Sequence, residues 1–242
     1  MVNPKKLITL GRSAIFIATI LIMAPLISLV PIANAQEQDV SVREPSRQLT
    51  SQWWQWVLSI PTEDNPLLDT TGAECQQGDM GDVFFLVGTF SVSGGSAGSA
   101  ERECTISEGQ DILIPIINAV CLDLPGGLNP DLPGVFQRPK GPGGSCQETN
   151  ESFMDTVDLS SLELTIDGVS FGSLEDFRVQ SNPFPIRLPE DNLFGAPPGT
   201  YIGISDGIWV IVEGLPVGEH TIEFGGQADG FTVHVTYHLT VE

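Results

Sequence analysis

The stretch "DGIWVIVEGLPVGEHTIEFGGQADGFTVHVTYHLTVE", residues 206–242, decides the fold. Turn residues at 214–218 and 225–230 divide it into three predicted strands. In the last strand, apolar residues alternate with polar ones. The apolar set is Phe231, Val233, Val235, Tyr237, Leu239 and Val241; the polar set is Thr232, His234, Thr236, His238 and Thr240. A period of two with one apolar side is typical of an antiparallel sheet that has one face in water.

Other short apolar segments extend the β pattern along the chain. Residues 162–166 alternate before Asp167-Gly168, a strong hairpin pair, and residues 82–90 and 111–121 are further strand candidates. Pro115 within the last of these indicates an edge position or a bulge. No long helical period follows residue 60. The sequence therefore predicts an all-β protein, an antiparallel β-sandwich of immunoglobulin-like or jelly-roll-like type, in one domain over 49–242.

One short helix is predicted before these strands, over about residues 51–60 in "SQWWQWVLSIP". Thr50 or Ser51 is its expected N-cap and Pro61 its expected end. At 100° per residue, one face carries Trp53, Trp56, Val57 and Ile60, and Trp54 and Leu58 widen the apolar arc. Most of this cluster is expected in the core. Trp54 is the tryptophan most easily spared from the core, and it is therefore a candidate ligand contact.

The first 35 residues have the pattern of a signal peptide. A basic start and an apolar run over 14–30 precede "ANA", with cleavage expected before Gln36. The alternative is an uncleaved membrane anchor, because the apolar run is long enough to nearly span a bilayer. Cleavage would leave a flexible N-terminal segment over 36–48 and a secreted or periplasmic protein without a membrane segment.

The chain is strongly acidic, with 31 Asp and Glu against 10 Lys and Arg and a net charge of −21. Such a negative field argues against binding to nucleic acid or to anionic lipid, because both are polyanions. It permits calcium binding, but a solvated acidic surface is the simpler interpretation. No other cofactor is predicted.

The four cysteines, Cys75, Cys104, Cys121 and Cys146, all follow the leader. An even number in an oxidising compartment indicates two disulfides. Three pairings are open. Nearest-neighbour pairing is favoured because each bridge would close a glycine-rich loop, including the Gly- and Pro-rich loop over 122–145. Zinc is disfavoured, because the sequence has no CxxC spacing and no histidine near a cysteine.

Three motif groups, "WWQW…IPTEDNP…C", "LIPIINAVC" and "GEHTIEFGG…VTYHLTV", resemble an uncharacterised family of exported bacterial proteins. The resemblance covers nearly all of the chain after the leader. It implies export but no activity, cofactor or catalytic residue. In addition, "LPVGEHTIEF" resembles a strand connection of immunoglobulin-like sandwiches, which is a hint about the fold alone.

Two sequence patterns suggest catalysis or metal binding, but the predicted secondary structure around each of them argues against that function. Residues 203–207 match the G-x-S-x-G nucleophile elbow around Ser205, but an apolar β-branched segment follows in place of a helix, and Asp206-Gly207 resembles a turn. His234 and His238 are four residues apart, which on a strand separates them by about 13 Å, too far to share an ion. His220 opens the preceding strand in an uncertain register. No catalytic or metal-binding residue is predicted.

Acidic side chains cluster at 63–65 with Asp69 and at 190–192, where oxygen ligands suited to calcium occur. Turn and capping hydrogen bonds explain both clusters equally well. A pair of carboxylates for glycoside cleavage forms in space and leaves no spacing rule, so no pair can be nominated.

The leading hypothesis is an exported, non-catalytic β-sandwich that acts as a binding or envelope-associated module. Its expected partner is a glycan or an envelope protein. The alternatives are a secreted hydrolase that uses paired carboxylates on an extracellular polymer, and a structural component of the envelope.

Overall fold

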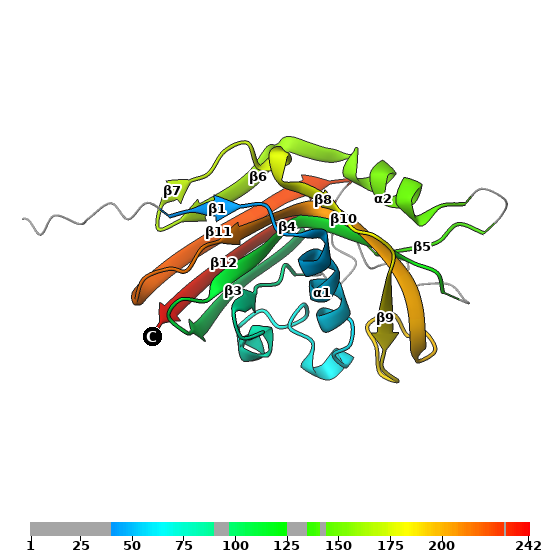
Figure 1. The fold of residues 1–242 in the computed structure, drawn as a ribbon, viewed down its shortest axis with the longest axis horizontal. Helices are drawn as coiled ribbons and strands as arrows, with labels where there is room; N and C mark the ends of the chain where they lie inside the picture. Colours follow the sequence, from blue (N-terminus) through cyan, green and yellow to red (C-terminus); the bar gives the residue numbers. More distant parts are fainter. Residues whose placement is uncertain (1–39, 90–96, 125–134, 141–143, 230) are drawn as a thin grey trace, which may run out of the picture. The chain divides into compact units, whose positions relative to one another are not determined.

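The strands form two sheets in a computed structural model that describes residues 40–242, apart from 90–96, 125–134, 141–143 and 230 (Figure 1). The predicted signal peptide lies outside the described residues. All described residues belong to the unit Asp39–Glu242. Within them, no helix is long and apolar enough to cross a membrane.

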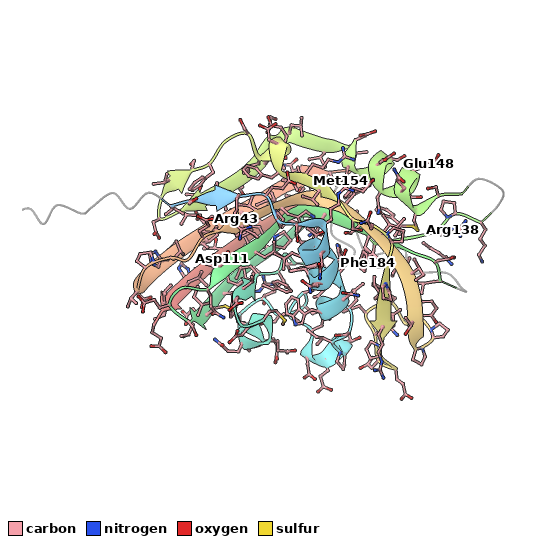
Figure 2. The ribbon with its side chains drawn as sticks, viewed as in Figure 1. Arg43, Asp111, Arg138, Glu148, Met154 and Phe184 are labelled. Atoms are coloured by element: carbon pink, nitrogen blue, oxygen red, sulfur yellow. A yellow bond between two sulfur atoms is a disulfide. The ribbon has the colours of Figure 1, made fainter. Side chains whose placement is uncertain are left out.

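The first sheet follows the order β1-β10-β4-β2, with β5 paired to β4 and with β8 and β9 paired to β10. Its strands are β1 Val42–Arg43, β2 Val83–Phe85, β4 Asp111–Leu122, β5 Val135–Gln137, β8 Arg178–Gln180, β9 Phe184–Leu188 and β10 Gly199–Val212. An ion pair of 2.7 Å between Arg43 and Asp111 connects the ends of β1 and β4 (Figure 2).

The second sheet follows the order β3-β12-β11-β6-β7. Its strands are β3 Ala97–Ile106, β6 Val157–Ile166, β7 Val169–Ser170, β11 Gly218–Ala228 and β12 Phe231–Val241. The helices are α1 Arg47–Val57 and α2 Cys146–Met154, with the short 3-10 turns η1 Thr62–Asp64, η2 Cys75–Gly78 and η3 Leu174–Phe177.

The mostly β composition is confirmed, but both sheets are mixed, so the prediction of purely antiparallel sheets is wrong. β3 runs parallel to β12 in the second sheet, and β2 and β5 run parallel to β4 in the first. The chain reaches β4 from β2 by way of β3, which lies in the other sheet. A connection of that length imposes no hairpin reversal, and therefore the paired strands can point the same way.

The three strands predicted over 206–242 are present as β10, β11 and β12, with one turn misplaced. β11 continues to Ala228, so Gly225 and Gly226 lie inside the strand rather than in a turn. A Cβ on Gly225 would collide with the backbone carbonyl of Val233 on β12. Glycine is used here because the neighbouring strand β12 passes too close for a side chain, which is a tertiary constraint.

Both faces of the first sheet are buried. In β10, Val210 and Val212 belong to the hydrophobic cluster shared with the second sheet, whereas Trp209 and Ile211 belong to the cluster that includes α1. The first sheet therefore lies between the second sheet and α1. This double burial explains the nearly continuous apolar runs of β4 and β10, in contrast to the clean alternation of β12.

Two predictions about local geometry are confirmed. Asp167 and Gly168 both have positive φ in the tight turn between β6 and β7. The register between β4 and β10 shifts where Ile208 pairs with Ile117 but Trp209 pairs with Pro115, which places a bulge beside the proline. Proline lacks the N–H that regular pairing requires, and the bulge accommodates it.

The helix boundaries differ from prediction. α1 begins at Arg47, and Ser46 is its N-cap, whose hydroxyl accepts a hydrogen bond from the Leu49 N–H at 3.2 Å. The hydroxyls of Thr50 and Ser51, the expected caps, instead donate to the Arg47 carbonyl within the helix. α2 was not predicted, because its short polar sequence has no clear apolar period.

Two segments expected to lack regular structure contain strands. In the predicted flexible segment 36–48, Val42 and Arg43 pair with β10 and α1 already begins at Arg47. In the predicted Gly- and Pro-rich loop 122–145, β5 pairs with β4. Both strands are only two or three residues long, and a neighbouring long strand supplies their hydrogen bonds. Strands this short leave little signal in sequence.

The two predicted disulfides are present in nearest-neighbour pairing. Cys75 bonds to Cys104, with Cα atoms 5.9 Å apart, and attaches η2 to β3. Cys121 bonds to Cys146, with Cα atoms 5.2 Å apart, and attaches β4 to the start of α2. Each bridge closes a loop of moderate length, which in the chain-entropy model stabilises the fold by roughly 3 kcal/mol.

Arg102 on β3 is a buried cation, with 1% of its surface exposed. Its guanidinium donates to the phenol oxygen of Tyr237 at 2.9 Å and lies 5.3 Å from the centre of that ring. The remaining hydrogen bonds end on the backbone carbonyls of Pro66, Asp69, Val87 and Gly88, at 2.7–3.2 Å. One side chain thus joins two loops to the second sheet.

Replacing Arg102 by Met should lower the free energy of unfolding by more than about 3 kcal/mol, because several buried carbonyls lose their donors. Urea denaturation of the oxidised protein measures this. Arg187→Met, at an exposed position of β9, is the control and should change stability by less than about 0.5 kcal/mol. Equal stability of the two variants would show that Arg102 does not organise the fold.

Candidate functional site

The exposed side of the second sheet carries polar side chains at nearly every outward position; we call it the outer face. Its residues are Glu101, Glu103 and Thr105 on β3, His234, Thr236, His238 and Thr240 on β12, Glu219, Thr221 and Glu223 on β11, and Glu163 and Thr165 on β6. Five of these twelve residues are glutamates, and none is Lys or Arg. The outer face is therefore an exposed, polar and negatively charged surface.

The two outer-face histidines each contact a separate carboxylate. His234 Nδ1 lies 2.6 Å from Glu163, and His238 Nε2 lies 2.8 Å from Glu101. Gly225 pairs with both Glu163 and His234 in the register, so the glutamate reaches the imidazole across a position without a side chain. His220 is outside the face and pairs with Asp167 at 2.7 Å. The described residues contain no group of three or more side chains that could hold a metal ion.

One end of the outer face is hollowed where η2 approaches the sheet. The hollow has a volume of about 480 Å³. Its rim on the η2 side is held by the first disulfide and by Gln76, which donates to the Thr105 carbonyl at 2.7 Å. The lining residues are Gly72, Cys75, Gln76, Glu103, Cys104, Thr105, Glu219, His238 and Thr240.

The charge of the hollow comes from Glu103 and Glu219. The Thr240 hydroxyl donates to Glu219 at 3.1 Å and holds that carboxylate in place, and both glutamates are exposed. Carboxylates, hydroxyls and an imidazole thus converge on one concave surface. These are hydrogen-bond acceptors and negative charges, the groups that bind a cationic or hydroxyl-rich ligand.

A second polar cluster joins α2 to β8 and β10. Gln180 Nε2 lies 3.2 Å from Glu151 and 3.4 Å from Asp206, so two carboxylates are neighbours there. Asp206 has 1% of its side chain exposed, and both its oxygens accept hydrogen bonds from Arg178 at 2.8 and 3.1 Å. The hydrogen bond with Asp206 raises the pKa of Arg178.

Two carboxylates meet in this cluster, as glycoside cleavage requires, but their chemistry is unsuitable for it. A general acid needs a raised pKa. Hydrogen bonds from Gln147 and Gln180 instead lower the pKa of Glu151. Asp206, sealed by Arg178, cannot reach a substrate. The cluster is best explained as an ion-pair network that attaches α2 to the first sheet.

Ser205 lies in the middle of β10 and is fully buried. Its N–H donates to the Ser181 hydroxyl at 2.8 Å, as part of the contact with the segment after β8. Asp206 and Gly207, predicted as a turn, continue the strand and pair with Ala119 and Asn118 of β4. Asp206 can occupy a buried strand position because Arg178 neutralises its carboxylate. The local preference of Asp-Gly for turns gives no information about this distant partner.

The tryptophans differ from one another in the structure. Trp53 and Trp54 each have 1% of their surface exposed, and Trp56 is half-buried. Trp53 Nε1 donates to the Leu86 carbonyl at 2.7 Å. Trp54 Nε1 is buried without a hydrogen-bond partner in the described part of the chain. Trp54 lines a small cavity of about 20 Å³, large enough for about one water molecule, so it is an internal residue and not a surface platform.

The two acidic clusters considered for calcium are turns. The amide groups of Asn65 and Asn192 are buried and bond to nearby backbone; Asn192, for example, donates to the carbonyls of Pro189 and Ala196. Asp69 accepts hydrogen bonds from the N–H groups of Thr71, Gly72 and Glu74. Burial raises the pKa of Asp69, but the combined effect of these hydrogen bonds is larger and opposite. The net result is a pKa below the ordinary value of 3.8.

Sequence reasoning found the alternation of β12 but missed most of the outer face. β3 and the side chains of Glu101 and Glu103 were missed because residues 91–100 resemble a flexible loop. The signal that could have located them is the alternation of Ala100, Arg102, Cys104 and Ile106 with charged or polar neighbours. Arg102 occupies one of the inward positions that are otherwise apolar, and this charged residue hides the alternation.

No family model, curated protein or solved structure matches this chain.

Trp53→Phe should cost about 1 kcal/mol more stability than Trp54→Phe, because only Trp53 donates to a protein carbonyl. Both substitutions remove similar volume, so each is the packing control for the other. Equilibrium urea unfolding gives the difference. If Trp54→Phe is the costlier change, the Trp54 N–H has a partner that stabilises the fold.

Asp69→Asn should destabilise the protein at neutral pH and should matter less in acid. A lowered folded-state pKa gives stability that is present above the unfolded-state value, about 3.8, and is lost as pH falls through the folded-state pKa. Unfolding free energies between pH 2 and 7 measure the difference from wild type, with exposed Asp176→Asn as the control. A difference that does not shrink below about pH 3.8 would contradict this assignment.

Proposed function

We propose that this chain is an exported, non-catalytic β-sandwich protein that binds a component of the cell envelope through its outer face. The proposal includes its membership of the exported bacterial family that its motifs resemble. The sandwich architecture, of immunoglobulin-like or jelly-roll-like type, is supported by the single hydrophobic cluster that both sheets share.

The observation that carries the proposal is the composition of the outer face. Four adjacent strands present carboxylate, hydroxyl and imidazole groups on one exposed surface. A sheet face that served only to keep the protein soluble would not need a hollow. Here the hollow of about 480 Å³ interrupts the face and is lined mainly by polar groups.

Export is supported by the chemistry of the cysteines. Two disulfides persist in oxidising compartments and are rare in the cytosol. The predicted leader agrees with this location. The negative net charge disfavours nucleic acid and anionic lipid as partners.

The hydrolase alternative finds no suitable acid in the pair Glu151 and Asp206, because the pKa of Glu151 is lowered and Asp206 is sealed. A purely structural role makes no use of the acidic character of the outer face. Binding is therefore the interpretation that uses the most features of this surface.

Residues 36–242, purified with both disulfides intact, should bind a bacterial envelope fraction saturably and leave the fraction chemically unchanged. Thr221→Arg with Thr236→Arg, in the centre of the outer face, should weaken that binding about tenfold, since large cations would cover the acceptor groups. Ser152→Arg, at an exposed position of α2, is the control. Co-sedimentation measures binding, and release of reducing sugar or peptide would establish a hydrolase instead.

A further inference from the structure

We infer that the hollow at the η2 end of the outer face accepts the cationic side chains of a basic protein segment, rich in Lys or Arg. This inference rests on the proposed function and names the partner of the same surface. Its basis is the charge and shape of the hollow together with the composition of the face that continues from it.

The charge of the surface selects the partner. The outward positions of β3, β12, β11 and β6 carry five glutamates without a Lys or Arg among them. The described residues that line the hollow likewise include two glutamates and no Lys or Arg. Complementary charge steers encounter and suppresses the wrong partners, so an anionic partner is repelled from this face.

The groups inside the hollow match an ammonium or guanidinium ion. Glu103 lies on β3 and Glu219 on β11, and Thr240 of β12, between these strands, holds the Glu219 carboxylate by a hydrogen bond of 3.1 Å. A cationic side chain that enters the hollow can donate to either carboxylate, and charge-assisted hydrogen bonds are stronger than neutral ones. His238, held by Glu101 at 2.8 Å, closes the side toward the rest of the face.

The lack of tryptophan, tyrosine and phenylalanine favours a peptide over an amino-sugar polymer. None of the outward residues of the outer face is Trp, Tyr or Phe, and neither is any described residue that lines the hollow. Sugar rings present apolar faces that bind best against flat aromatic side chains. A basic peptide needs carboxylates, which β3, β11 and β6 supply on this face.

The rigid frame of the hollow makes its geometry persistent. The Cys75–Cys104 disulfide and the Gln76 hydrogen bond to the Thr105 carbonyl fix η2 against β3. The neighbouring Asp69 turn and the buried Arg102 hold the preceding loop. A preformed site loses less conformational entropy on binding than a flexible one.

The test measures binding of the oxidised protein to a fluorescent decalysine peptide, with a decaglutamate peptide as the reverse-charge probe. The double variant Glu103→Gln with Glu219→Gln should bind decalysine about tenfold more weakly, from two lost exposed ion pairs. Glu175→Gln with Glu190→Gln removes the same net charge from exposed positions elsewhere and should change affinity less than twofold. Thermal unfolding of each variant verifies that the fold is intact.

The outcomes separate this inference from the proposed function. If both double variants weaken decalysine binding equally, net charge alone attracts the peptide and the hollow site is overturned. If wild type binds the envelope fraction but not decalysine, or binds a polymer of glucosamine in its place, the partner class is wrong and the binding function stands. If wild type binds neither the envelope fraction nor decalysine, the inference and the proposed function both fail.

Discussion

The fold depends on a cation that is removed from water. The Arg102 guanidinium carries a full charge into the core, where an unpaired charge would be prohibitively unfavourable. No carboxylate neutralises it among its hydrogen-bond partners; backbone carbonyls and the phenol of Tyr237 share that task. These carbonyls come from segments without regular secondary structure, and their hydrogen bonds to the arginine help to fix those segments. The loop before η2 and the segment after β2 are thus attached to the same side chain.

This arrangement explains why β3 can combine two opposite roles. Its inward positions contribute Arg102 and Cys104 to the interior, and its outward positions contribute Glu101 and Glu103 to the outer face. The period of two keeps these roles apart, since a slip of one residue would expose the arginine and bury the glutamates. The parallel pairing with β12 then sets Glu103 beside His238. Stability and the acidic surface are therefore fixed by the same register.

Sequence alone predicted what local pattern controls. The alternation of β12, the Asp167-Gly168 turn and the bulge beside Pro115 follow from a few neighbouring residues. The pairing of the cysteines, one of three that the sequence left open, was favoured because each bridge closes a glycine-rich loop. The misplaced features depend on distant contacts. Asp206 is a strand residue because Arg178 neutralises its carboxylate. Gly225 lies in a strand because the backbone of the adjacent strand β12 passes close to it. The short strands β1 and β5 depend on the long strands that they pair with.

The candidate site was less predictable than the fold for the same reason. His234 and His238 were correctly placed on a polar face, but their carboxylate partners come from β6 and β3, more than 70 residues away. No spacing rule connects Glu103 to Glu219, because the hollow exists only where three strands and η2 meet. Acidic residues in an acidic chain carry almost no individual information. They become a site when a sheet sorts them onto one side, excludes lysine and arginine from that side, and sets a disulfide-held turn against its edge.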